Sequence, residues 1–242
     1  MRIIFSRKGF DSANGGRPSP IIGGRPRSLP IPEKTGASST YGDLGLGDLV
    51  EAVTRGRLKA EDGCHDDPMF ADDFWWFGQS GAAQGHLRKQ GVGSGDMFLF
   101  FGLFADEAKR ERHHRIFGYL EVTGHGPPDR VREEPGWREP PRSHPHFSDK
   151  PRRQNTIYFG PGAIARHDSA KLRLTTETGP TSRWAIPAWL NETGLSRHGN
   201  AKRWEIPGEL ATVAIGQEFV CDIGSSPEAK NWLQGIMQEV RR

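Results

Sequence analysis

The chain contains very little cysteine. Cys64 and Cys221 are the two present in 242 residues, and no CxxC pair occurs. A disulfide framework and a zinc ribbon both need several cysteines at short spacings, so both are excluded. Cys64 directly precedes His65, but neighbours along a chain seldom face each other, and we do not expect a thiol nucleophile. Because the histidines are also scattered, we predict no obligatory, tightly bound transition metal.

Long apolar stretches are absent as well. The most hydrophobic segment, Met97–Phe104, has the length of a strand, whereas a membrane-spanning helix needs about 20 apolar residues. The opening residues MRIIFSRKGF lack the basic segment and the long apolar run of a signal peptide. We therefore expect a cytoplasmic protein with no membrane partner.

Neither sign of charge dominates. Lys and Arg number 33, Asp and Glu number 30, and the formal net charge is +3, with no long block of one sign. This balance permits contacts with phosphate but does not supply an extended basic surface. We predict that DNA binding has a shallow salt dependence, equivalent to about one to three phosphate contacts. The same few cations, Arg7, Lys8 and Arg197, should then serve a nucleotide and a duplex alike.

Familiar nucleotide-binding and catalytic motifs are missing. The chain has no P-loop, GxGxxG, GxSxG, HExxH or HxE…PCxxC motif. These absences exclude several well-known enzyme classes, and the sequence leaves the cofactor unknown.

Glycine, proline and aromatic residues are plentiful. The chain has 31 Gly and 18 Pro, while 7 Trp and 13 Phe recur along its length. We interpret this as ordered turns and long loops around a core. The prediction is one α+β domain, residues 1–242, with a largely antiparallel sheet or partly closed β-barrel, peripheral helices and long loops. A PUA-like barrel and a second domain after about residue 160 are the alternatives.

The hydrophobic pattern predicts where the strands and helices lie. Met97–Phe104 and Arg115–Val122 should pair as an antiparallel hairpin at the centre of the sheet, because both are rich in aromatic or β-branched residues. Residues 124–155 form a Pro-, Arg- and His-rich loop, which at this length is either functional or mobile. Other strands are expected at Arg2–Phe5, Thr156–Phe159 and Gln217–Asp222, and helices at 47–57, within 78–89 and at Pro227–Arg241.

Two polar segments carry the main candidates for catalysis. Arg7, Lys8 and Asp11 follow the first strand; the two cations can hold a phosphate, and Asp11 can act as a general base. His65 and Asp67 form a candidate acid/base pair. We predict that all five side chains share one cleft, since loops at sheet ends often hold ligands. The alternative is a pair of ordered turns with solvated charges.

Other candidates rest on residue type alone. Gln79 and Gln84 carry amides that can match the edge of a base, and His86 lies beside them. Arg197 and His198 can clamp an anion. For these residues the alternative is an ordinary solvated surface.

The His144-Pro-His146 segment and the aromatic runs have competing interpretations. Two histidines in an extended segment can point the same way, although loop histidines are usually solvated. We expect Phe74–Phe77 and Phe98–Phe104 to form core rather than stacking platforms for bases.

Several long motifs resemble the nucleotide modification associated domain 3 family. They cover nearly the whole chain and include FSRKGFDSANGGRPSPI, SLPIP, TYGDL, CHDDP, FGQSGAAQGHLRKQGVGSGDMFLFFGLF, HRIFGYLEV, RWAIPAWL and LSRHGNAKRWEIPG. The matching polar positions are Arg7, Lys8, Asp11, His65, Asp67, Gln79, Gln84, His86, Arg197 and His198. Asp66 departs from the family pattern, which has a hydrophobic residue there, and this implies that Asp67 is the functional carboxylate.

The resemblance implies a role in making or handling hypermodified DNA bases. The first hypothesis is an enzyme, a transferase or hydrolase acting on a nucleotide or DNA base. The GD…IFGYLEV segment also resembles the hairpin of PUA-like domains, which favours the second hypothesis, a non-catalytic reader of modified nucleic acid. The third is a scaffold subunit of a modification complex. Expected partners are a nucleotide or nucleic acid and other enzymes of the same system.

Overall fold

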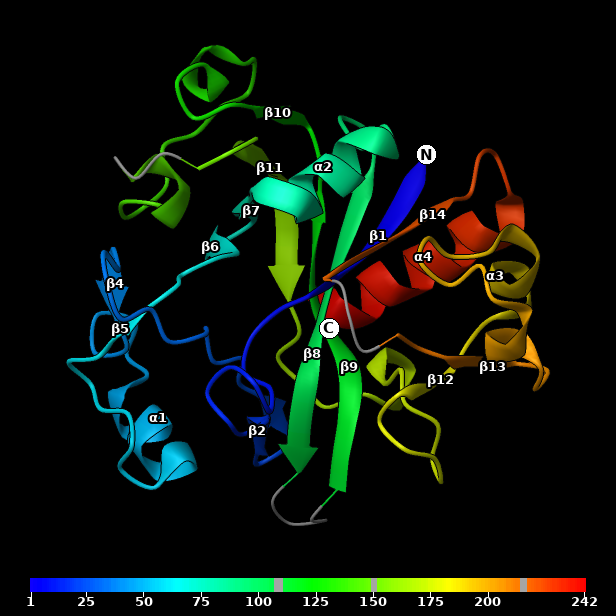
Figure 1. Ribbon diagram of the computed structural model, residues 1–242, viewed down its shortest axis with the longest axis horizontal. Coiled ribbons are helices and arrows are strands. Elements are labelled where there is room, and N and C mark those ends of the chain that lie inside the picture. The colour runs from blue at the N-terminus through cyan, green and yellow to red at the C-terminus, as the bar shows by residue number, and fades with distance from the viewer. Residues whose placement is uncertain (107–110, 149–151, 214–216) are drawn as a thin grey trace.

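The chain adopts an α+β fold. A computed structural model describes residues 1–106, 111–148, 152–213 and 217–242. A mostly antiparallel sheet curls into a half-barrel, with helices around it (Figure 1). The predicted fold class, including its antiparallel sheet and peripheral helices, is confirmed. None of the helices in the described part of the chain is both long and apolar enough to cross a membrane.

The main sheet runs in the order β14-β1-β8-β9-β11-β7-β6. Its strands are β1 (Arg2–Arg7), β6 (Met69–Ala71), β7 (Phe74–Gln79), β8 (Met97–Asp106), β9 (Glu111–Glu121), β11 (Thr156–Ile164) and β14 (Glu218–Asp222). Short strands are β2 (Ser19–Ile22), β3 (Arg25–Pro26), β4 (Ser39–Thr40), β5 (Gly63–Cys64), β10 (Gly124–Gly126), β12 (Arg183–Ala185) and β13 (Glu209–Ala211). The helices are α1 (Gly47–Thr54), α2 (Gly81–Lys89), α3 (Ala188–Thr193) and α4 (Pro227–Arg241).

The predicted central hairpin is confirmed. β8 and β9 pair antiparallel from Met97↔Glu121 to Asp106↔Glu111. β1 lies parallel to β8 and antiparallel to β14. Since β1 is buried between these two strands, the residues that follow it emerge beside the start of β14. This pairing brings the N-terminal loop next to Glu218.

Residues on β8 alternate between two cores, as the two-residue period of a strand requires. Leu99 and Phe101 belong to the cluster that α4 covers, while Phe98 and Phe100 face β7 and its aromatic residues. Figure 1 shows α4 on one side of the β8–β9 hairpin and the segment carrying α1 on the other. The Phe74–Phe77 run is fully part of β7 and buried, which confirms its interpretation as core.

The His-rich loop packs against the sheet instead of extending into water. His144 is 0% exposed and His146 is 3% exposed, so the expectation that loop histidines are solvated is wrong here. The short 3₁₀ turn Pro145–Phe147 lies on β7, and a Cβ added at Gly78 would overlap the His146 ring. Gly78 therefore allows the close approach on which this burial depends.

A buried ion pair anchors the segment that follows β11. Arg115 on β9 is 0% exposed and pairs with Asp168, whose side chain is 24% exposed. Burial lowers the pKa of Arg115, although Asp168 opposes that shift. Removing one member of a buried pair leaves the other without compensation.

We expect Arg115→Met to lower the free energy of unfolding by about 2–3 kcal/mol. Removing one partner of a fully buried ion pair costs about 3–5 kcal/mol. The expected loss is smaller here because Asp168 keeps some access to water. Urea unfolding measures the change. The matched control is Arg132→Met, because the side chains of Arg132 and Glu139 are 56% and 61% exposed. Loss of this exposed ion pair should lower the free energy of unfolding by less than about 1 kcal/mol. Equal losses in the two variants would contradict a structural role specific to Arg115.

Candidate functional site

A polar cavity of about 290 Å³ lies at the end of β1. Its walls come from the loop after β1, the segment before β6, the end of β7 and the Pro145–Phe147 turn. The polar side chains that line it include Arg7, Lys8, Asp11, His65, Asp67, Gln79, His146 and Arg152. The prediction that the N-terminal loop shares a cleft with His65 and Asp67 is therefore confirmed as geometry.

Asp67 is the most enclosed carboxylate of this cavity. Its side chain is 3% exposed, and its Oδ1 lies 3.3 Å from His144 Nε2. The backbone N–H of Gly78 donates to the same oxygen at 2.8 Å. Burial opposes the charged form, but His144, His146 and Lys8 together hold the pKa of Asp67 well below its usual range. Asp67 is thus a buried anion held in a defined orientation.

Two histidine rings turn toward the other oxygen of Asp67. His65 Nε2 lies 3.8 Å from Oδ2, and His146 Nε2 lies 3.9 Å from it. His65 Nδ1 is 3.1 Å from the Glu33 carboxylate. His146 Nδ1 is 2.5 Å from Asn155 Oδ1, and the Asn155 amide is oriented by donating to the His146 carbonyl at 2.8 Å. Because both partners are acceptors, either ring, in its neutral form, carries its proton on Nδ1 and presents an Nε2 lone pair.

Burial also determines the charge of His146. Desolvation lowers the pKa of His146 to about 4, although the nearby Asp67 opposes the shift. The ring is therefore neutral near pH 7 and available as an acceptor or ligand.

Lys8 belongs to a buried charge network that the sequence did not reveal. Lys8 Nζ lies 3.3 Å from Glu218 Oε1, with side chains that are 11% and 1% exposed. Gln79 Nε2 donates to the same oxygen at 2.6 Å. The Lys8 ammonium also lies 4.3 Å from the centroid of the Phe77 ring. Glu218 thus neutralises Lys8 and orients Gln79 at the cavity wall.

Asp11 and Arg7 line the cavity but also hold structure. Asp11 Oδ1 accepts from the backbone N–H groups of Ala13 at 2.8 Å and Asn14 at 2.6 Å, which closes a local turn. Arg7 Nη2 donates to the Val213 carbonyl at 3.3 Å. Because Asp11 is partly exposed and closes this turn, whereas Asp67 is enclosed and faces two histidine rings, Asp67 is the better candidate for a catalytic carboxylate.

Gln84 and His86 lie on α2, away from the cavity. The Gln84 amide and the Tyr158 hydroxyl exchange hydrogen bonds of 2.9 and 3.1 Å. His86 Nε2 lies 2.9 Å from Ser196 Oγ. These contacts join α2 to its neighbours, and they give no support to the predicted binding roles of the two residues.

Arg197 and His198 are also outside the cavity. Arg197 is exposed in a left-handed conformation with φ 68°. His198 is 1% exposed; its Nδ1 donates to the Ser196 carbonyl, and its Nε2 accepts from the backbone N–H of Val213 at 3.2 Å. The segment supports the position of Val213, the acceptor for Arg7, and its predicted anion clamp has no geometric support.

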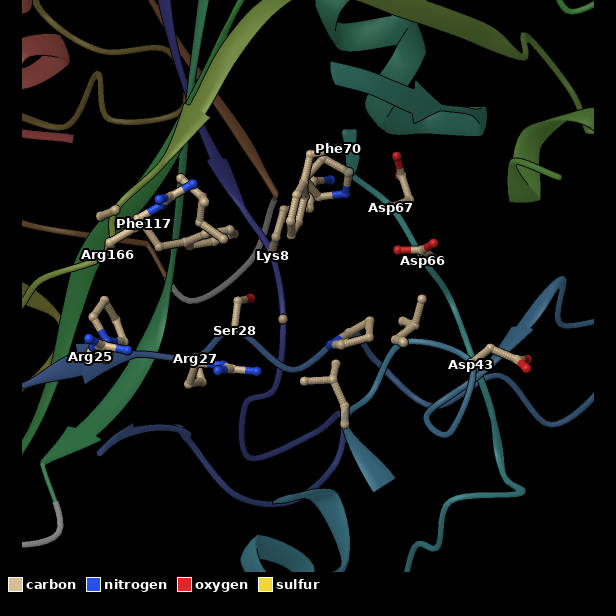
Figure 2. A pocket seen from close by; sticks show the side chains of 18 of the residues that line it. Lys8, Arg25, Arg27, Ser28, Asp43, Asp66, Asp67, Phe70, Phe117 and Arg166 are labelled. Carbon is tan, nitrogen blue, oxygen red and sulfur yellow. The ribbon is translucent and has the colours of Figure 1, made fainter. Parts of the chain in front are cut away.

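A larger groove of about 760 Å³ adjoins the cavity and shares Lys8, Gly9 and Asp67 with it. Figure 2 shows Arg25, Arg27 and Arg166 on one side of this groove, with Asp43, Asp66 and Asp67 on the other and Lys8 between them. All three arginines are exposed. In the described part of the chain, no carboxylate forms an ion pair with any of them. The arginine side is therefore suited to an anion.

Phe70 provides an apolar surface in the same groove. Its side chain is 41% exposed, unusual for a large hydrophobic residue in this fold. One face of the ring stacks on Trp75, with centroids 4.8 Å apart and an interplanar angle of 27°. Because Trp75 is 0% exposed, this contact holds the Phe70 ring in place. A planar ligand can pack against such a ring.

Asp66 and Cys64 flank the site without entering its chemistry. Both Nε and Nη2 of Arg142 donate to Asp66 Oδ2, at 3.2 and 2.8 Å. Burial raises the pKa of Asp66, although Arg142 opposes the shift. Burial also raises the pKa of Cys64 to about 12. A thiol with that pKa is unreactive near neutrality.

Sequence reasoning missed residues whose importance depends on tertiary contacts. Glu218 stands in a strand where a charged residue normally faces solvent, and the three groove arginines come from segments remote in sequence. The spacing of His144 and His146 did mark them as candidates. The length of the Pro-rich loop that carries them was a further signal, since a long loop inside a compact domain is often functional.

These features define an α+β protein with a carboxylate–histidine cavity opening beside an arginine-lined groove. The family model for nucleotide modification associated domain 3 matches residues 2–222 of the chain. The chain belongs to the nucleotide modification associated domain 3 family. No curated protein and no solved structure matches it.

Proposed function

We propose that the protein is an enzyme that acts on a nucleotide or a DNA base in a base-modification pathway, by group transfer or hydrolysis. The observation that carries this proposal is the position of Asp67. A buried, ionised carboxylate faces two histidine Nε2 atoms at the junction of a polar cavity and an arginine-lined groove. Such convergence of shifted pKa values in a concave site is typical of catalytic centres.

The groove supplies the binding part of the proposal. Its volume of about 760 Å³ lies within the about 300–1,000 Å³ range of small-molecule sites. Arg25, Arg27 and Arg166 would hold phosphate through charge-assisted hydrogen bonds, while the base would stack on Phe70. Lys8 and Asp67 would then lie beside the base or the sugar, where the reaction takes place.

The reader function is the second candidate, and the exposed Phe70 ring is the observation that favours it. A reader needs an aromatic surface and a phosphate clamp but makes no use of a buried carboxylate with three neighbouring histidines. The two functions therefore differ in whether Asp67 matters after binding.

Binding can be tested with the four deoxynucleoside monophosphates and with single- and double-stranded oligonucleotides. We expect Arg166→Ala to weaken mononucleotide and oligonucleotide binding by about tenfold each, since a hydrogen bond to a charged group contributes about 1.5–3 kcal/mol. Arg88→Ala is the matched control, because Arg88 is exposed on α2 and lines neither cavity.

The same titrations at several salt concentrations measure the number of phosphates contacted. For the oligonucleotides we expect a slope equivalent to about one to three phosphates. A steep slope for duplex, no mononucleotide binding and no effect of Arg166→Ala would together contradict the proposed site. The protein would then be a surface binder of nucleic acid.

A further inference from the structure

We propose that His65, Asp67 and His146 bind a divalent transition-metal ion through His65 Nε2, His146 Nε2 and Asp67 Oδ2. The three ligand atoms all lie within 4.8 Å of one another, and all three residues line the 290 Å³ cavity. The inference concerns the site of the proposed function and rests on it for the ion's role in the reaction. Metal binding itself needs no substrate.

The hydrogen bonds around these atoms favour a shared cation. Both Nδ1 atoms face acceptors, Glu33 and Asn155, so in the neutral form each ring offers its Nε2 atom as an acceptor. Asp67 Oδ2 is an acceptor too. In that tautomer three acceptor atoms face one another. The separations of 3.8 and 3.9 Å exceed those of a hydrogen bond.

The spacing suits a shared ion. Ligand atoms around a tetrahedral ion with bonds of about 2.1 Å stand about 3.4 Å apart. The two nitrogen–oxygen separations therefore need to shorten by about half an ångström, and the two ring nitrogens, which lie within 4.8 Å of each other, by up to about 1.4 Å. Two imidazoles and one carboxylate form a ligand set used by catalytic zinc and by non-haem iron, with the remaining positions open. Here the open positions would face the cavity.

Outer contacts support each ligand, as in established metal sites. Glu33 orients His65, and Asn155 orients His146. Gly78 N–H donates to Asp67 Oδ1 and His144 Nε2 faces the same atom, which leaves Oδ2 for the ion. In the catalytic role, the ion would polarise a substrate oxygen or lower the pKa of a bound water.

The sequence predicted no tightly bound metal because its histidines are scattered. The structure does not test that prediction directly, but the fold brings two distant histidines to one carboxylate. Our proposal is therefore the opposite of the expectation from spacing alone.

Cobalt(II) is the probe for this site, because its visible spectrum reports coordination by protein ligands. After chelation and dialysis, wild-type protein should bind one equivalent of Co²⁺ and develop a d–d absorption band. Loss of a residue that hydrogen-bonds to a metal ligand typically weakens metal binding by about 10–100-fold. His65→Gln removes a ligand itself, so it should weaken Co²⁺ binding by more than that. The His65 side chain is 18% exposed, so this variant is expected to fold. His125→Gln is the control, because His125 does not line the cavity.

Variants of Asn155 test whether its contact with His146 Nδ1 positions the ring for metal binding. Asn155→Leu should weaken Co²⁺ binding by about 10–100-fold, whereas Asn155→Asp, which keeps the acceptor for His146 Nδ1, should retain it. Proton NMR of the Co²⁺-loaded wild type adds a test without variants, since two paramagnetically shifted, exchangeable imidazole N–H signals are expected.

The metal proposal is overturned if wild-type protein takes up no stoichiometric Co²⁺, Zn²⁺, Mn²⁺ or Fe²⁺, or if His65→Gln binds as well as His125→Gln. Neither result affects the nucleotide titrations with Arg166→Ala. Failure of the wild-type protein to bind any nucleotide, with Co²⁺ binding intact, would instead remove the proposed function and leave the metal site standing.

Discussion

Asp67→Asn is expected to lower the level of the modified base by at least about 100-fold in cells that carry the modification system. A positioned acid or base contributes about 10²–10⁴ to a rate, and asparagine removes the charge on which the two histidines converge. The amide can still accept from Gly78 N–H, so the fold should survive. Mass spectrometry of nucleosides from total DNA, with deletion and wild-type complementation alongside, measures the effect.

The matched control for this variant is Asp73→Asn. The Asp73 side chain is 85% exposed and lines neither cavity, so full modification is expected. Asp11→Asn should have a smaller effect than Asp67→Asn, because Asp11 is partly exposed and closes a local turn, whereas Asp67 faces two histidine rings. Normal modification with a folded Asp67→Asn protein would exclude catalysis at this site and favour the reader or scaffold function.

Lys8→Met should destabilise the protein by about 3–5 kcal/mol, the cost of leaving one member of a buried ion pair without its partner. Glu218 would be that member, since it is 1% exposed and otherwise accepts only from Gln79 among the hydrogen bonds described. Chemical unfolding measures the loss.

A double variant separates stability from function. In Lys8→Met/Glu218→Gln no charge is buried, so most of the lost stability should return. Nucleotide binding should stay weak if Lys8 also contacts the substrate. Recovery of both stability and binding in the double variant would mean that Lys8 has a structural role alone.

Local patterns were sufficient for the central part of the fold. The β8–β9 hairpin was predicted because aromatic and β-branched residues fill both strands and a charged segment joins them, and both signals are local in sequence. The same holds for β1, β14 and α4. The half-barrel and the parallel pairing of β1 with β8 depend on which faces pack together, which no single segment contains.

Polar motifs were a weaker guide to the candidate site. Asp67, His65 and Lys8 do meet, whereas Gln84 and His198 carry equally prominent polar groups that satisfy buried partners. A sequence gives the residue type but not the partner, and buried polar groups almost always find one. Only the structure separates a glutamine that bonds Tyr158 from one that faces a cavity.

Glu218 and His146 belong to the site for reasons that the sequence does not contain. Glu218 acquires its role because β14 pairs with β1, and His146 because Gly78 admits its ring against β7. Both depend on contacts between residues more than sixty positions apart in the sequence. Spacing motifs could not connect them to Asp67.

A crystal structure of the protein soaked with the four deoxynucleoside monophosphates tests the central claim most directly. Our account predicts one nucleotide in the groove, with its phosphate among Arg25, Arg27 and Arg166. Its base should lie on Phe70, and the base or sugar should point toward Asp67. A nucleotide bound elsewhere, or an empty groove at saturating concentration, would contradict the claim that the groove and the Asp67 cavity form one substrate site.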